Sequence, residues 1–221
     1  MINKFDENKS FDYENGFYLT SLPVRFGNML AHYELYKKTI GVPGDIVECG
    51  VFKGTSLIQW ATFRELLENE DSRKIIGFDI FGEFPSEWTK SEKSDQKFAD
   101  DWNRQFGGEF ITCQELQSSL ALKGINNVEL VKGDIKHTLP TYFRGGGQIR
   151  ISLLHVDVDV YEPTKFVLEQ LWDRVVVGGM VILDDYGMVE GATVAIDEFF
   201  RDKKSRIEKL TISHKPVYVI K

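Results

Sequence analysis

The segment Asp45-Ile-Val-Glu-Cys-Gly-Val-Phe-Lys-Gly-Thr-Ser56 changes from a short apolar run to a turn with two glycines and then to a helical pattern. The run 45–49 predicts a buried strand, and the apolar spacing after Thr55 predicts a helix. Gly50 and Gly54 let the backbone pass close to a ligand, and the N-terminus of the helix offers unpaired N–H groups to it. A tight strand–helix turn with capping residues explains the same pattern without a ligand.

The same alternation of apolar runs and helical patterns continues on the C-terminal side, which is typical of a parallel α/β sheet. The further strands that we expect share short runs of apolar residues, at 74–79, 128–131, 149–156 and 179–183. Helices are expected at about 163–173 and 193–200, and a closing hairpin at 207–213 and 216–220. The sequence therefore predicts a Rossmann-like α/β fold with a mostly parallel sheet and helices on both faces.

Two segments lie outside this alternation. Residues 1–40 begin polar and continue into a helical pattern, which predicts an N-terminal helical cap. Residues 81–112 mix aromatic and charged side chains over a length that favours a lid above the site. A peripheral helix with an aromatic underside explains this insertion equally well. The length of the whole chain, 1–221, fits a single domain.

Composition and charge narrow the classes of function. The chain has 221 residues, a formal net charge of −7 and a sequence pI near 5.2, whereas a nucleic-acid-binding surface normally needs a basic face. No apolar run approaches the roughly 18 residues that span a bilayer, and the N-terminus lacks the apolar core of a signal peptide. Two cysteines are too few for a disulfide framework. We expect a cytoplasmic protein without a nucleic-acid or membrane partner, while homo-oligomerisation stays open.

Acidic residues follow the second and third expected strands. Asp79 ends the second, where a carboxylate can accept hydrogen bonds from both hydroxyls of a ribose. Asp134 follows the third, at a position that can approach a base. Because the closely spaced glycines of a Gly-x-Gly-x-x-Gly fingerprint are absent, a dinucleotide is a poor candidate for the ligand.

Four more carboxylates follow the fourth and fifth strands. Asp157 and Asp159 come after one, and Asp184 and Asp185 after the other. Such a cluster would repel itself without a cation, and a hard ion such as magnesium takes oxygen ligands. The ion could bind a substrate hydroxyl and lower its pKa, while a remaining carboxylate takes the proton. Helix capping by these acids is the alternative, and His155 is expected to pack in the core, with a role as base only if the metal is absent.

These motifs resemble those of the macrocin O-methyltransferase family, class I methyltransferases that modify sugar hydroxyls of natural products. The resemblance covers about residues 41–187 and depends on four ordered motifs, at 44–54, 77–85, 155–164 and 178–187. It implies a seven-stranded sheet with an antiparallel last strand, S-adenosylmethionine as the methyl donor, and magnesium as the usual metal.

The resemblance also implies roles for single residues. Asp157, Asp184 and Asp185 would be the metal ligands, and Asp159 would be the general base. For the donor, Asp79 would bind the ribose and Asp134 would lie near the adenine. The methionine end would lie on the turn after the first strand, whose contributing residues are Glu48, Gly50, Lys53, Gly54, Thr55 and Ser56.

We therefore expect an S-adenosylmethionine-dependent, magnesium-assisted O-methyltransferase. Its acceptor would be a hydroxyl of a sugar, a glycoside or a related small molecule. Compared with the family the chain looks short at its N-terminus, and residues 86–112 follow no pattern of the family, although both parts would shape the acceptor pocket. A phenol or a lipid head group is therefore an alternative acceptor, and a non-catalytic ligand-binding module is the alternative to an enzyme.

Overall fold

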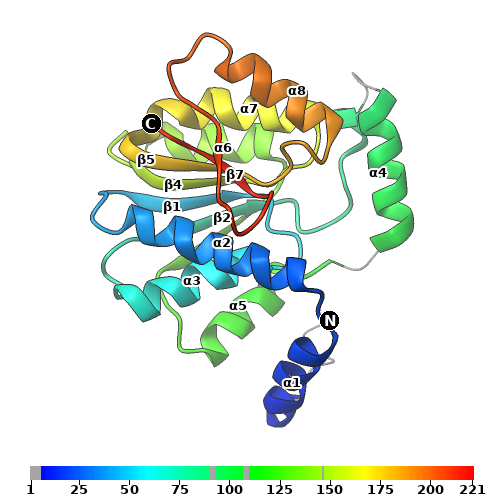
Figure 1. The fold of residues 1–221 in the computed structure, drawn as a ribbon, viewed down its shortest axis with the longest axis vertical. Helices are drawn as coiled ribbons and strands as arrows, with labels where there is room; N and C mark the ends of the chain where they lie inside the picture. The colour runs from blue at the N-terminus through cyan, green and yellow to red at the C-terminus, as the bar shows by residue number, and fades with distance from the viewer. Residues whose placement is uncertain (1–5, 90–92, 107–109, 146) are drawn as a thin grey trace.

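The apolar runs of the sequence pair into one sheet. A computed structural model describes residues 6–89, 93–106, 110–145 and 147–221, and in this part of the chain the sheet has seven strands in the order β3-β2-β1-β4-β5-β7-β6 (Figure 1). The strands are β1 (Asp45–Cys49), β2 (Ile75–Asp79), β3 (Val128–Lys132), β4 (Ile151–Val156), β5 (Val175–Leu183), β6 (Glu208–Lys209) and β7 (Val217–Ile220).

The direction of the strands follows the prediction. β1 to β5 pair in parallel, whereas β7 runs antiparallel to both β5 and β6. The expected closing hairpin is therefore present, although β6 is only two residues long. Because the first five strands are parallel, their carboxyl ends meet at one edge, where open α/β sheets bind ligands.

Helices cover both faces of this sheet. The longer ones are α1 (Ser10–Thr20), α2 (Pro23–Thr39), α3 (Thr55–Leu67), α4 (Lys93–Phe106), α5 (Cys113–Leu122), α6 (Ile135–Arg144), α7 (Tyr161–Leu171) and α8 (Glu190–Phe200). Buried residues of α2, α3 and α5 form one core with one face of the sheet, and those of α6, α7 and α8 form a second core with the other. Successive residues of a strand supply opposite cores, as Ile46 and Val47 show. No helix among the described residues has the length and apolar character needed to cross a bilayer.

The two segments outside the alternation are helical. In the predicted cap, residues 1–5 lie outside the described residues, α2 packs on the sheet, and α1 was not expected. α1 buries none of its residues and points away from the body of the protein (Figure 1). In the predicted lid, residues 90–92 and 107–109 lie outside the described residues, and the rest contains a 3₁₀ turn, η3 (Ser86–Thr89), and α4.

Candidate functional site

A pocket opens at the carboxyl edge of the parallel strands. Its floor comes from the ends of β1, β2 and β4 and the segment after β3, which contribute Gly50, Asp79, Gly133, Asp157 and Asp159. The wall on the other side is aromatic and comes from the insertion, with Phe84, Trp88, Trp102, Phe106 and Phe110. The pocket thus brings together predicted residues from three motifs that lie far apart in the sequence.

Asp79 holds the turn that follows β1. Its Oδ2 accepts hydrogen bonds from the backbone N–H of Val51, at 2.7 Å, and from that of Phe52, at 2.9 Å. Its Oδ1 accepts a third from the N–H of Phe81. The carboxylate therefore fixes the glycine turn and still lines the pocket, where the predicted ribose contact would use its remaining lone pairs.

Gly50 lies where the two strand ends approach each other most closely. Its φ is +92°, and a Cβ built on it would lie 1.7 Å from the carbonyl oxygen of Asp157. The Asp157 N–H donates to the carbonyl of Cys49 at 2.9 Å, so the backbones on both sides are tied together. Glycine is needed here for contact between two protein segments, in addition to any approach to a ligand.

The other predicted residues of the turn lie outside the pocket lining. Glu48 is fully buried on the face of the sheet that α3 covers, and its Oε1 accepts a hydrogen bond from the Ser56 Oγ at 2.7 Å. The ammonium of Lys53 lies over the Phe52 ring, Gly54 is the N-cap of α3 with φ +80°, and Thr55 is exposed. The contact of these residues with the donor stays a prediction. In this structure the hydrogen bond between Glu48 and Ser56 links β1 to the first turn of α3 and so stabilises the turn between them.

Asp134 caps the helix that follows β3. It is the N-cap of α6, and its carboxylate accepts the N–H of Lys136 at 2.8 Å. Its neighbours Gly133 and Ile135 line the pocket, whereas Asp134 does not. The segment is therefore at the pocket, while the predicted contact of the Asp134 side chain with adenine stays a prediction.

Three of the four carboxylates after β4 and β5 lie close together, and the backbone of the fourth, Asp159, contacts one of them. Oxygens of Asp157, Asp184 and Asp185 lie within 4.8 Å of one another. Asp185 Oδ2 also accepts the backbone N–H of Asp159 at 2.9 Å, and Asp159 has a positive φ of 64°. Asp157 and Asp159 line the pocket, so the cluster faces the same space as the glycine turn.

Burial and mutual repulsion perturb these acids. Burial, followed by the charges of Asp184 and Asp185, raises the pKa of Asp157 well above its usual value. Burial and the same two neighbours raise the pKa of Asp159 as well. The pKa of Asp185 rises to about 7 because of burial and the charge of Asp184. An all-carboxylate set that repels itself in this way fits a hard divalent cation.

Two buried histidines contact Asp184 from the opposite side. The Nε2 atom of His32, on α2, lies 3.8 Å from Asp184 Oδ1, and that of His155 lies 3.9 Å from the same oxygen. His155 Nδ1 lies 3.7 Å from Glu48 Oε2. Although burial acts in the other direction, the two histidines hold the pKa of Asp184 below its usual range. His155 is thus part of a polar chain inside the core, and His32 has no sequence motif that would have revealed it.

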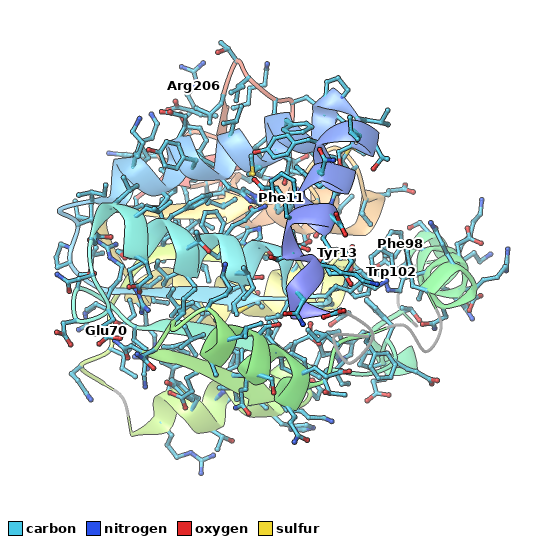
Figure 2. The ribbon with its side chains drawn as sticks, turned by 90° about the horizontal axis from the view of Figure 1, so that it is seen from below. Phe11, Tyr13, Glu70, Phe98, Trp102 and Arg206 are labelled. Atoms are coloured by element: carbon cyan, nitrogen blue, oxygen red, sulfur yellow. The ribbon has the colours of Figure 1, made fainter. Side chains whose placement is uncertain are left out.

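The aromatic wall rests on the glycine turn. The Trp102 ring centroid lies 4.9 Å from that of Phe52, and the Phe106 centroid lies 5.6 Å from it. Figure 2 shows Phe98 and Trp102 pointing from α4 toward the body of the protein, and their rings stack at 5.8 Å. The insertion therefore forms a wall of the pocket, whereas its predicted movement as a lid stays a prediction.

Comparisons with known proteins find a family and related sequences. The family described as Macrocin-O-methyltransferase (TylF) matches residues 28–220. One relative is 8-demethyl-8-(2,3-dimethoxy-alpha-L-rhamnosyl)-tetracenomycin-C 4'-O-methyltransferase of Streptomyces olivaceus. The two sequences are 30% identical over 151 residues, and this alignment covers 67% of this chain and 55% of the relative. It is 30% identical over 181 residues to demethyldecarbamoylnovobiocin O-methyltransferase of Streptomyces niveus, covering 80% of this chain and 66% of the relative. The chain thus spans between 55% and 66% of the length of these two relatives.

Solved structures show the same fold. The O-methyltransferase NovP superposes with a TM-score of 0.75 at 27% identity, covering 88% of this chain and 79% of that chain. A calicheamicin methyltransferase superposes with a TM-score of 0.72 at 23% identity, covering 99% of this chain and 88% of that chain. The sheet order and the antiparallel end are therefore those of a class I methyltransferase fold.

Proposed function

Because the chain belongs to the macrocin O-methyltransferase family, we propose that it transfers a methyl group from S-adenosylmethionine to a hydroxyl of a sugar or glycoside, with the help of magnesium. The main support for this proposal is that the glycine turn after β1 and two carboxylates after β4 line the same pocket. We also propose that residues 1–221 act as one methyltransferase domain.

The donor half of the pocket has the chemistry that S-adenosylmethionine needs. Phe78, Trp88 and Ile135 give an apolar and aromatic surface that suits a purine ring. Asp79 lines the same space and can accept a hydrogen bond from a ribose hydroxyl. The Gly50 turn then leaves the methionine end of the donor near the carboxylates of the acceptor half.

The acceptor half can deprotonate and orient an alcohol. Asp157, Asp184 and Asp185 would hold a magnesium ion, which supplies Lewis acidity to an acceptor hydroxyl when it is bound. The carboxylate of Asp159 takes the hydroxyl proton as the new C–O bond forms and the S–C bond of the sulfonium breaks. The donor leaves as neutral S-adenosylhomocysteine. Because the Asp159 N–H binds Asp185, the base and the ligand set keep a fixed relation.

A sugar is the acceptor class that the relatives favour. The name of the Streptomyces olivaceus relative includes a rhamnosyl group, and a relative from Micromonospora griseorubida is mycinamicin III 3''-O-methyltransferase. The methylated product of the experiment below identifies the sugar and the position of the hydroxyl.

The test measures product formation by the purified chain. S-Adenosylmethionine is supplied with rhamnosyl glycosides or with catechol, in magnesium or in EDTA, and mass spectrometry follows S-adenosylhomocysteine and the methylated acceptor. We expect turnover with a rhamnosyl glycoside that EDTA abolishes. Turnover of catechol alone would refute the sugar as acceptor, and undiminished turnover in EDTA would refute the role of the metal. If calorimetry with the same protein finds no binding of S-adenosylhomocysteine, the whole assignment is refuted.

A further inference from the structure

α4 carries a buried carboxylate at the end that lies away from the pocket wall. Asp95 is fully buried, and its Oδ2 accepts the backbone N–H of Tyr161 at 2.9 Å. Tyr161 is the first residue of α7. The first N–H groups of a helix have no partner within the helix, and the helix dipole favours negative charge there. Asp95 therefore caps α7 from a different helix.

Neither α7 nor α8 has a side-chain cap of its own. The residues at their N-cap positions are Val160 and Val189, and neither makes a capping hydrogen bond with its side chain. The Asp95 carboxylate also lies against the first turn of α8, because a Cβ on Gly191 would come within 2.1 Å of its Oδ1. In Figure 1 one end of α4 lies beside the ends of α7 and α8, in agreement with this contact.

The contact links two parts of the site. Tyr161 lies two residues after Asp159, which lines the pocket. At the other end of α4, Trp102 and Phe106 form the pocket wall on Phe52. Apart from Asp95 itself, Ala99 is the residue of α4 that is buried, within the part of the chain that the structure describes. Phe98 of α4 packs against the core beside these two residues, and Asp95 adds a buried polar attachment of the helix to the body.

We propose that Asp95 is a positioning residue, which fastens α4 to the N-termini of α7 and α8 and so holds Trp102 and Phe106 in place as the wall of the pocket. Burying a carboxylate costs desolvation free energy, so it gains little stability. Its hydrogen bonds, however, form in only one arrangement of the donor groups, which suits a residue that fixes the position of a helix. That the pocket binds S-adenosylhomocysteine rests on the proposed function, whereas the attachment of α4 by Asp95 does not.

Three variants test the contact from both sides. Asp95→Ala removes the acceptor, Asp95→Asn keeps an acceptor oxygen but loses the charge, and Gly191→Ala places a methyl group where the carboxylate lies. Asp101→Ala is the matched control, since Asp101 is a half-exposed acid of the same helix that pairs only with Arg104 across 3.2 Å among the described contacts. Such an exposed pair contributes little.

Two readouts separate positioning from general stability. Calorimetry measures the affinity for S-adenosylhomocysteine, and hydrogen exchange measures protection of the amides in 93–106 and in β1 and β4. We expect Asp95→Ala to weaken binding about 10-fold or more and to raise exchange in α4 but not in the strands. Asp95→Asn should recover part of the affinity, Gly191→Ala should resemble Asp95→Ala, and Asp101→Ala should resemble the wild type.

The outcomes that overturn the proposal are distinct from those that overturn the function. Wild-type protection of α4 in Asp95→Ala, or in Gly191→Ala if Asp95→Ala does not fold, would show that the contact does not hold the helix. Raised exchange with unchanged affinity would show that the helix is held but that its position does not matter to the pocket, which also refutes the proposal. If the wild type binds no S-adenosylhomocysteine, the proposed function fails, and the exchange in α4 still decides whether Asp95 fastens it.

Discussion

Replacing Gly50 by alanine should damage the protein before any ligand is added. A Cβ at this position would lie 1.7 Å from the carbonyl oxygen of Asp157 and 2.6 Å from its carbonyl carbon. Neither backbone is free to retreat, because the Gly50 N–H donates to Phe78 and the Asp157 N–H donates to Cys49, each at 2.9 Å. The methyl group can therefore be accommodated only if the two strand ends separate.

Two costs add at this position. A side chain at a φ of +92° costs roughly 1–2 kcal/mol by the scale of left-handed backbone strain. Forcing a methyl group into a closely packed place typically costs about 1–3 kcal/mol more. We therefore expect Gly50→Ala to lower the free energy of unfolding by about 2–5 kcal/mol, a large part of the roughly 5–15 kcal/mol that stabilises an ordinary domain.

Urea unfolding without donor measures this loss, and Gly82→Ala is the matched control. Gly82 lines the same pocket, but its φ is not in the left-handed region and the nearest atom to its Cβ would be the Ile80 carbonyl oxygen at 3.7 Å. Its replacement should change the free energy of unfolding by no more than about 0.5 kcal/mol. If Gly50→Ala unfolds like the wild type and loses only donor affinity, the glycine serves the ligand alone and the backbone argument is wrong.

Two further predictions concern the carboxylates of the pocket. Asp79→Ala should weaken the binding of S-adenosylhomocysteine by about 1–3 kcal/mol, because it removes a charged acceptor together with the hydrogen bonds that fix Val51 and Phe52; unchanged affinity by calorimetry would exclude Asp79 from the donor site. Asp157→Asn should weaken magnesium binding, whereas Asp159→Asn should leave the affinities for magnesium and donor intact and slow turnover about 10²–10⁴-fold. Equal losses of magnesium affinity in the two variants would place Asp159 among the ligands.

The sheet was predictable because its strands have a distinctive composition. β1, β2, β4 and β5 lie inside the sheet with helices on both faces, so most of their residues are buried and form apolar runs in the sequence, whereas the edge strand β3 is only partly buried. β5 begins at Val175, four residues earlier than predicted. The prediction was late because the glycine pair 178–179 was interpreted as the turn before the strand. α6 was missed because it contains Pro140 and many polar residues. α1 was missed because it buries nothing and so has no apolar face to reveal it.

The site was predictable only where it depends on strand ends. The carboxyl ends of parallel strands meet by geometry, which is why Asp157 and Asp184 could be placed together without knowing a single contact. His32 and Asp95 carry no such signal, since each lies on a helix whose position relative to the sheet is set by tertiary packing. Asp134 shows a second possibility, because a residue at a strand end can direct its side chain to the N-terminus of its own helix, and its contact with adenine stays a prediction.

The same contacts explain why the donor half and the acceptor half of the pocket depend on each other. The turn after β1 is held from one side by the Asp79 carboxylate and pressed from the other against the backbone of Asp157, which is also a proposed metal ligand. A displacement of the turn that moves the donor must therefore move Asp157 as well. In-line methyl transfer needs the sulfonium and the hydroxyl to be aligned closely, and a shift of about 1 Å can cost two orders of magnitude in rate. In the proposed reaction, contact between the backbones of Gly50 and Asp157 would supply this alignment, without requiring a side chain to span the pocket.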